Sequence, residues 1–219
     1  MHDLCRTARE RGEPCEWFES LYRESQGDVD RVPWADDAPN AHFLAGMELP
    51  GIPRGGRALV TGCGFGDDAE ALAGMGFSVT AHDVSPSAIE WCRRKHPSSE
   101  VRYEVGDVFE PPMRYHHAFD LVLEVYTLQA IPLPHRGAGF APIADCVAPG
   151  GVLLAVMRGR DDETLVDADG PPWAISRKEC AAFEDRGLML ESWEDFHDQE
   201  EPPNRRFRMV LRRPLEGVR

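Results

Sequence analysis

The sequence predicts an α/β fold with a doubly wound, seven-stranded sheet that ends in an antiparallel C-terminal hairpin. From residue 57 onward, short apolar runs of strand length alternate with segments of helical composition. This alternation is typical of parallel strands joined by crossover helices. A glycine-rich turn after the first apolar run and two β-rich runs near the end of the chain complete the pattern.

The sheet elements are expected in one catalytic domain, residues 56–219, behind an N-terminal helical cap, residues 1–55. Strands are predicted at 58–61, 78–82, 101–105, 121–125 and 152–157, with helices at 67–74, 86–95 and about 137–147. Ser85 is a suitable N-cap for the second of these helices, and Pro86 suits its first helical position. The arrangement is Rossmann-like.

The last two β-rich runs, residues 188–196 and 205–213, are separated by the turn-prone stretch 198–204. Pro202 and Pro203 lie inside this stretch, which favours a turn over a continued strand. We therefore expect an antiparallel hairpin at one edge of the sheet.

Composition narrows the class of function. The 219 residues carry a formal net charge of -14, which disfavours nucleic acid and anionic membrane surfaces as partners. No apolar run approaches the roughly 18 residues of a membrane span, so we expect a cytoplasmic protein. With nucleic acid and membranes disfavoured as partners, we expect a small-molecule substrate. The six cysteines show no close pairing and the histidines are scattered, so no metal site is predicted.

The strongest local signal for a ligand is the turn Gly62-Cys63-Gly64, which continues through Gly66 into the acidic pair Asp67-Asp68. Dinucleotide folds place their third glycine one position later and bring a helix N-terminus to pyrophosphate. An acidic pair at the helix start repels phosphate but suits a cofactor without pyrophosphate. The turn, with Cys63 included, is therefore predicted to bind S-adenosylmethionine rather than NAD.

Two further acidic residues end predicted strands beside this turn. Asp83 closes the second strand, where its carboxylate can accept hydrogen bonds from both ribose hydroxyls, with Val84 next to it. Asp107 ends the third strand and is expected to accept from the adenine amino group, while Val108 flanks the ring. These four residues are predicted cofactor contacts.

The fourth strand runs into Glu124 and Tyr126, which are expected near the methionine end of the cofactor and the substrate. Both are candidate catalytic residues, and Glu124 is also a candidate cofactor contact. Glu124 can bind a cationic group, orient a nucleophile or act as a base. A structural carboxylate satisfied by backbone amides explains it equally well.

The combined pattern resembles the thiopurine S-methyltransferase family, including the plant and bacterial thiol and halide methyltransferases, over almost the whole chain. The resemblance rests on ordered motifs: Trp17 and Tyr22, residues 32–34 (VPW), 59–64 (LVTGCG), 83–90 (DVSPSAIE), 119–122 (FDLV), 130–132 (AIP) and 170–173 (GPPW).

The resemblance implies cofactor contacts from Trp34, Gly62, Gly64, Asp83, Asp107 and Glu124. It also implies that the N-terminal segment covers the active site, and residues 1 to about 45 are predicted to form a mobile lid. Trp34 would place an aromatic face near the sulfonium, which is favourable by about 0.5 to 2 kcal/mol. The stretch 124–129 departs from the family pattern, so the resemblance does not specify the acceptor.

The function expected from these features is methyl transfer from S-adenosylmethionine to a small-molecule nucleophile, with S-adenosylhomocysteine as product. The lack of an obvious base favours a thiol or another soft nucleophile. Two alternatives stay open at this level: a nicotinamide-dependent oxidoreductase, and a catalytically silent protein that binds the cofactor.

Overall fold

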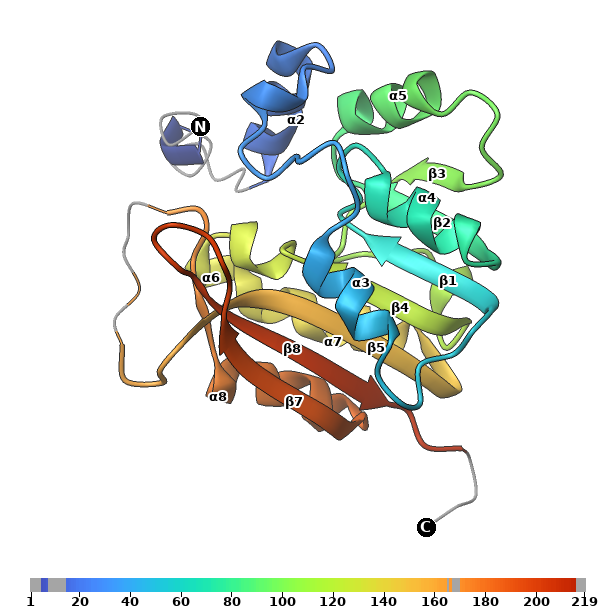
Figure 1. Ribbon diagram of the computed structural model, residues 1–219, viewed down its shortest axis with the longest axis vertical. Helices are drawn as coiled ribbons and strands as arrows, with labels where there is room; N and C mark the ends of the chain where they lie inside the picture. The colour runs from blue at the N-terminus through green and yellow to red at the C-terminus, as the bar shows by residue number, and fades with distance from the viewer. Residues whose placement is uncertain (1–4, 8–14, 165, 167–169, 216–219) are drawn as a thin grey trace.

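A seven-membered strand path, with one short additional strand, forms the centre of the molecule (Figure 1). The computed structural model describes residues 5–7, 15–164, 166 and 170–215. The strand order is β3-β2-β1-β4-β5-β8-β7, and β6 pairs with β5 off this path. The strands are β1 (Gly56–Thr61), β2 (Phe77–Asp83), β3 (Arg102–Val105), β4 (Phe119–Val125), β5 (Val147–Arg160), β6 (Ile175–Ser176), β7 (Met189–His197) and β8 (Arg205–Arg212).

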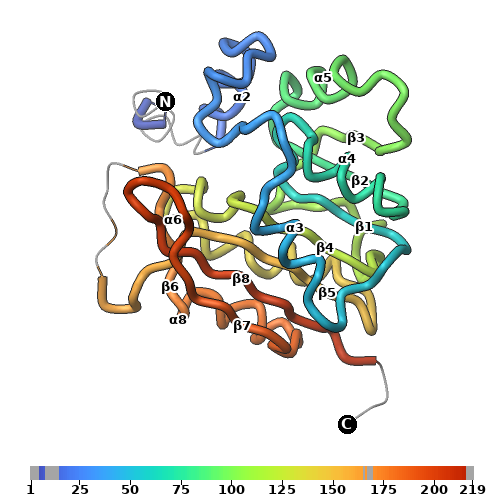
Figure 2. The backbone as a smooth tube through the Cα atoms, in the orientation of Figure 1, coloured from blue at the N-terminus to red at the C-terminus, as the bar shows by residue number. Residues whose placement is uncertain are grey.

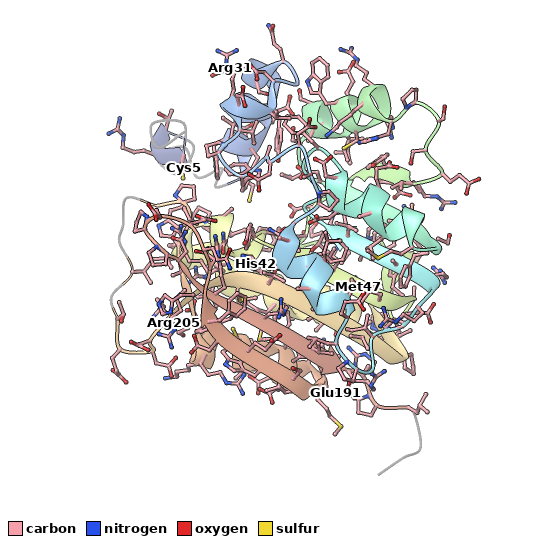
Figure 3. All side chains as sticks on the ribbon, viewed as in Figure 1. Cys5, Arg31, His42, Met47, Glu191 and Arg205 are labelled. Carbon is pink, nitrogen blue, oxygen red and sulfur yellow. The ribbon has the colours of Figure 1, made fainter. Side chains whose placement is uncertain are left out.

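The predicted C-terminal hairpin is confirmed. Strands β1 to β5 pair in parallel, whereas β8 pairs antiparallel with both β5 and β7. The chain thus adds β8 directly beside β5 and leaves β7 at the edge of the sheet. Figure 3 places Glu191 and Arg205 at opposite ends of this hairpin.

Helices cover both faces of the sheet, as a doubly wound fold requires. On one face, Phe43, Leu72 and Ile89 bring α3 (Ala41–Met47), α4 (Asp67–Gly74) and α5 (Pro86–Lys95) into one buried cluster with the strands. On the other face, Phe140 and Phe183 belong to a second cluster. Its helical elements are α7 (Phe140–Asp145), α8 (Arg177–Cys180) and the 3₁₀ helices η3 (Leu128–Ala130) and η5 (Ala181–Arg186).

The helix expected at about 137–147 is shorter and broken. The structure has α6 (Leu133–Arg136), then the 3₁₀ turn η4 (Gly137–Gly139), then α7. Two glycines within three residues weaken a continuous helix, and Pro142 is tolerated because it lies in the first turn of α7. A further 3₁₀ helix, η2 (Met113–Tyr115), precedes β4.

The N-terminal cap contains α2 (Glu16–Ser25), the 3₁₀ turn η1 (Val29–Arg31) and α3. Its chain runs from α2, which lies beside α5, down to α3 against the sheet (Figure 2). A third buried cluster joins Trp17 and Tyr22 of the cap to Phe65, Ala88 and Trp173 of the sheet domain. The cap therefore shares a core with the rest of the protein. The first four residues and residues 8–14 of the expected lid lie outside the described part of the chain.

A carboxylate holds α2 to the start of α5. The Oε2 atom of Glu19 accepts from the Ser85 hydroxyl at 2.6 Å and from the Ser87 amide at 3.0 Å, and Oε1 accepts from the Ser87 hydroxyl at 2.7 Å. These hydrogen bonds lower the pKa of Glu19 although its partial burial opposes them. A negative charge at a helix N-terminus is also favourable for the helix dipole.

We expect Glu19→Ala to reduce the free energy of unfolding by about 1 kcal/mol, because charged hydrogen bonds at a partly exposed site are screened by water. Amide hydrogen exchange should become faster in α2. Glu16→Ala, at an exposed position in the same helix, is the matched control. Equal stability and exchange in the two variants would contradict the role given to Glu19.

Candidate functional site

A cavity of about 360 Å³ lies at the carboxyl ends of the parallel strands, between the sheet and the cap. The cap, the ends of β1 to β5, the segment before β6 and the hairpin all contribute to its wall. The lining residues are Cys15, Phe18, Tyr22, Pro33, Trp34, Asp36, Gly62, His82, Asp83, Val84, Gly106, Asp107, Val108, Val125, Tyr126, Thr127, Gln129, Ala130, Ile131, Arg158, Pro171, Pro172, Glu200 and Arg206.

The glycine turn after β1 forms one side of this cavity. Gly62 has φ 61° and lines the wall, and a Cβ at this position would overlap the Thr127 side chain. Only glycine suits both the left-handed backbone and the close approach. The Gly64 amide donates a hydrogen bond to the Asp83 carboxylate, and the Cys92 thiol donates to the Gly64 carbonyl at 3.1 Å. Cys63 and Gly64, also predicted cofactor contacts, are not among the residues that line the cavity.

Asp83 is buried at the end of β2 and faces the cavity. Its Oδ2 accepts from the Gly64 amide at 3.0 Å, and its Oδ1 accepts from the Ser85 amide at 2.9 Å. Burial raises the pKa of Asp83 to about 6, although these amides oppose the shift. Each carboxylate oxygen has two lone pairs, so Asp83 retains capacity to accept from ribose hydroxyls. Val84 lines the wall beside it.

Asp107 and Val108 line the cavity just after the C-terminal end of β3, which pairs with the end of β2 at Asp83. The Oδ1 atom of Asp107 accepts from the Phe109 amide at 2.9 Å and leaves the second oxygen available. The His82 ring lies 3.2 Å from the Gly106 carbonyl, and burial lowers the pKa of this histidine. This end therefore offers acceptors and a neutral ring, which suits an adenosine.

The cap contributes an aromatic wall. Trp34 donates from Nε1 to the Tyr22 hydroxyl at 2.9 Å, and its ring meets those of Trp17 and Phe18 edge-on at 5.8 and 6.2 Å. Trp34, Tyr22 and Phe18 all line the cavity. An aromatic surface of this kind excludes water and attracts a sulfonium.

The two candidate catalytic residues occupy different places. Glu124 is fully buried beneath the cavity wall, where its Oε1 accepts from the Leu128 amide at 2.9 Å. Its Oε2 has no partner among the described residues, and burial raises its pKa to about 7. Tyr126 lines the cavity with φ 62°, and the Arg206 guanidinium lies 4.8 Å from the centre of its ring.

Several lining residues escaped the sequence analysis, above all Gln129, Arg158, Glu200 and Arg206. Arg206 lies within the β-rich run 205–213, which the sequence assigns only to the hairpin. A signal did exist for Arg158, because it is the polar residue that directly follows the apolar run 152–157. The same reasoning that selected Asp83 at the end of β2 applies to it.

The charges at the end of the cavity beside β2 and β3 suit the expected cofactor. The lining residues there include Asp83 and Asp107. The two arginines of the wall, Arg158 and Arg206, belong to β5 and β8 on the other side of β4. At the start of α4, Asp68 accepts from the Asn40 amide at 2.7 Å, and Lys95 binds Asp67 at 2.6 Å. The helix N-terminus is thus occupied by carboxylates, which fits S-adenosylmethionine and not a pyrophosphate.

Two negative findings concern the described residues only. They contain no cluster of three or more His, Cys, Asp or Glu side chains able to hold a metal ion. None of the helices among them has the length and apolar character needed to cross a membrane.

Comparisons with known proteins identify methyltransferases among the relatives of this chain. A "Methyltransferase domain" family model matches residues 58–151. The chain is 27% identical to "Probable thiol methyltransferase 2" of Arabidopsis thaliana over 162 residues, which cover 71% of this chain and 68% of the relative. It is 32% identical to "Thiocyanate methyltransferase 1" of Brassica oleracea over 148 residues, with 66% of this chain and 63% of the relative covered. For the Brassica protein, the match thus spans less than two thirds of its length.

Solved structures show the same fold. A protein described under "Conversion of a Disulfide Bond into a Thioacetal Group during Echinomycin Biosynthesis" superimposes with a TM-score of 0.73 and 24% identity, covering 93% of this chain and 94% of that one. The 1,6-didemethyltoxoflavin-N1-methyltransferase of Burkholderia thailandensis, with bound S-adenosylhomocysteine, has a TM-score of 0.60 and 17% identity over 97% and 87% of the two chains.

The fold, the acidic end of the cavity beside β2 and β3, and the named relatives agree with each other. The chain carries a methyltransferase domain with the fold of S-adenosylmethionine-dependent methyltransferases, and it is similar to plant thiol and thiocyanate methyltransferases.

Proposed function

We propose that this protein methylates a thiol, or a nucleophile of similar softness, on a small molecule and releases S-adenosylhomocysteine. The observation that carries the proposal is that neither glutamate near the acceptor end of the cavity is available as a base. Glu124 lies beneath the wall, and Glu200 is bound by Arg206 and Asn204. Thiols ionise with a pKa of about 8.5 and need no dedicated base, whereas alcohols do. The names of the plant relatives agree with a soft acceptor.

The cofactor, when bound, supplies an activated methyl group, and the chain contributes binding and alignment. Asp83 and Asp107 are proposed to hold the adenosine, with Val84 and Val108 beside it. Trp34 is proposed to cover the sulfonium and exclude water. Tyr126, at the junction of the two ends of the cavity, is proposed to contact the nucleophile.

We also propose that the cap acts as a lid, because it supplies Phe18, Tyr22 and Trp34 to the cavity wall. Ligand contacts with these rings would offset the entropy lost when the segment becomes fixed. Amide exchange in residues 15–47 should therefore slow when S-adenosylhomocysteine binds. Identical exchange in the free and bound protein would show that the cap is fixed packing.

Asp83→Ala should weaken binding of S-adenosylhomocysteine by about 1.5 to 3 kcal/mol, the scale of charged hydrogen bonds. In the wild type, affinity should fall as the pH drops below about 6, because protonation removes the charge on Asp83 that the ribose hydroxyls bind. Calorimetry at several pH values measures both effects.

Asp67→Ala is the matched control, since Asp67 lies outside the cavity wall. A folded Asp83→Ala variant with the affinity of the Asp67 control would remove Asp83 from the cofactor site.

Tyr126→Phe should reduce turnover about fivefold, the equivalent of about 1 kcal/mol for one lost hydrogen bond, with little change in cofactor affinity. Turnover and calorimetric affinity must be measured separately. Equal losses in both quantities would place the Tyr126 hydroxyl on the cofactor instead.

Glu124→Gln tests the second candidate through stability. The pKa of Glu124 is raised from 4.5 to about 7 in the folded protein, so the unfolded chain releases this proton first. The free energy of unfolding of the wild type should therefore fall as the pH rises between these values, by about 1 to 3 kcal/mol from this residue. In Glu124→Gln, the decrease in the free energy of unfolding between these pH values should be smaller by this amount. An unchanged pH profile of stability, together with lost turnover, would favour a catalytic base instead.

A further inference from the structure

Two arginines face each other at the acceptor end of the cavity. Arg158 of β5 and Arg206 of β8 are directly paired in the antiparallel register, and both line the wall. Like charges at directly opposed positions on neighbouring strands are destabilising. Each guanidinium therefore needs an anion to offset the repulsion.

Arg206 has its anions within the chain. Its Nε binds Asp198 at 2.7 Å, and a terminal nitrogen binds Glu200 at 2.8 Å. Burial would raise the pKa of Asp198, but the Asn204 amide and the Arg206 guanidinium outweigh it and lower the pKa to about 2. Both carboxylates are therefore committed to Arg206.

Arg158 has no such partner. One terminal nitrogen donates to the Asn204 side-chain oxygen, and its Nε is buried without any hydrogen-bond acceptor. Among the described residues, no carboxylate oxygen lies within 4.0 Å of its guanidinium. Burial and the neighbouring Arg206 lower the pKa of Arg158, although the charges of Glu200 and Asp198 oppose this shift.

We propose, building on the proposed methyl transfer, that Arg158 binds a carboxylate carried by the methyl acceptor. A guanidinium can hold a carboxylate with two parallel hydrogen bonds. The acceptor is then a small carboxylate-bearing thiol, with its sulfur near Tyr126 and its carboxylate at the tip of β5. Arg158 is in this view a specificity-determining residue that selects the acceptor by charge.

The sheet order places this subsite away from the adenosine. Strand β5 is separated from β1, which carries Gly62, by β4 alone, and from β2, which carries Asp83, by β1 and β4. At about 4.8 Å per strand, the tip of β5 lies about 10 Å from the glycine turn and about 14 Å from the end of β2. The cofactor has a carboxylate of its own, so the experiment must separate the two possible sources of the anion.

The test compares mercaptoacetate with its neutral amide, mercaptoacetamide, in the wild type and in Arg158→Gln. The ratio of kcat/KM for the two thiols should fall by about tenfold or more in the variant, through loss of the carboxylate substrate. Comparing ratios between enzymes cancels the different intrinsic reactivity of the two thiols. Arg160→Gln is the matched control, because Arg160 lies in the same strand but pairs with Glu179 outside the cavity wall.

Two further measurements separate this role from others. The affinity of Arg158→Gln for S-adenosylhomocysteine should stay within twofold of the wild type. A loss there as large as the loss with mercaptoacetate would assign the arginine to the cofactor's carboxylate and overturn the proposal. The melting temperature should not fall, because the substitution removes one charge of a like-charged pair, and a marked fall would indicate a structural role.

Calorimetric binding of mercaptoacetate to the complex of enzyme and S-adenosylhomocysteine requires no methyl transfer. Binding that depends on Arg158, without methylation of either thiol, would contradict the proposed function and leave the carboxylate subsite in place. Methylation of both thiols with the same kcat/KM ratio in the wild type and in Arg158→Gln would support the proposed function and contradict the carboxylate subsite. Absence of mercaptoacetate binding to that complex would also overturn the subsite.

Discussion

The buried carboxylate of Asp83 is the contact on which the rest of the site depends. By accepting from the Gly64 and Ser85 amides, it joins the glycine turn after β1 to the N-terminus of α5. Ser85 in turn donates to Glu19, which ties the cap to the same helix. The cost of burying this charge is visible in its raised pKa. One carboxylate thus connects the glycine turn, the proposed adenosine end of the cavity and the cap above it.

The acceptor end depends on a different constraint, the insertion of β8 between β5 and β7. This order brings Arg206 opposite Arg158 and lays the Arg206 guanidinium over the Tyr126 ring. The hairpin is therefore part of the site and not only an edge of the sheet. The proposed cofactor and acceptor subsites consequently lie on separate elements, β1 to β3 for the first and β4, β5 and β8 for the second.

Much of this architecture could be predicted, because it is encoded locally. Helices α4 and α5 occupy the residues expected from their capping and composition, and the polar ends of apolar runs located Asp83, Asp107 and Tyr126 at the cavity. The arginine pair could not be predicted, since it depends on the register of strands about 50 residues apart in sequence. Likewise, periodicity alone did not show that Glu124 turns beneath the wall, where Leu128 binds it.

The central claim is that this fold transfers a methyl group to a soft nucleophile rather than only holding the cofactor. It is tested most directly by release of S-adenosylhomocysteine from radiolabelled S-adenosylmethionine in the presence of separate pools of thiols, halides, amines and phenols. The account predicts release with thiols, accompanied by an equal amount of labelled thioether. Tight binding of S-adenosylhomocysteine without release in any pool, or release only with phenols or amines, would contradict it.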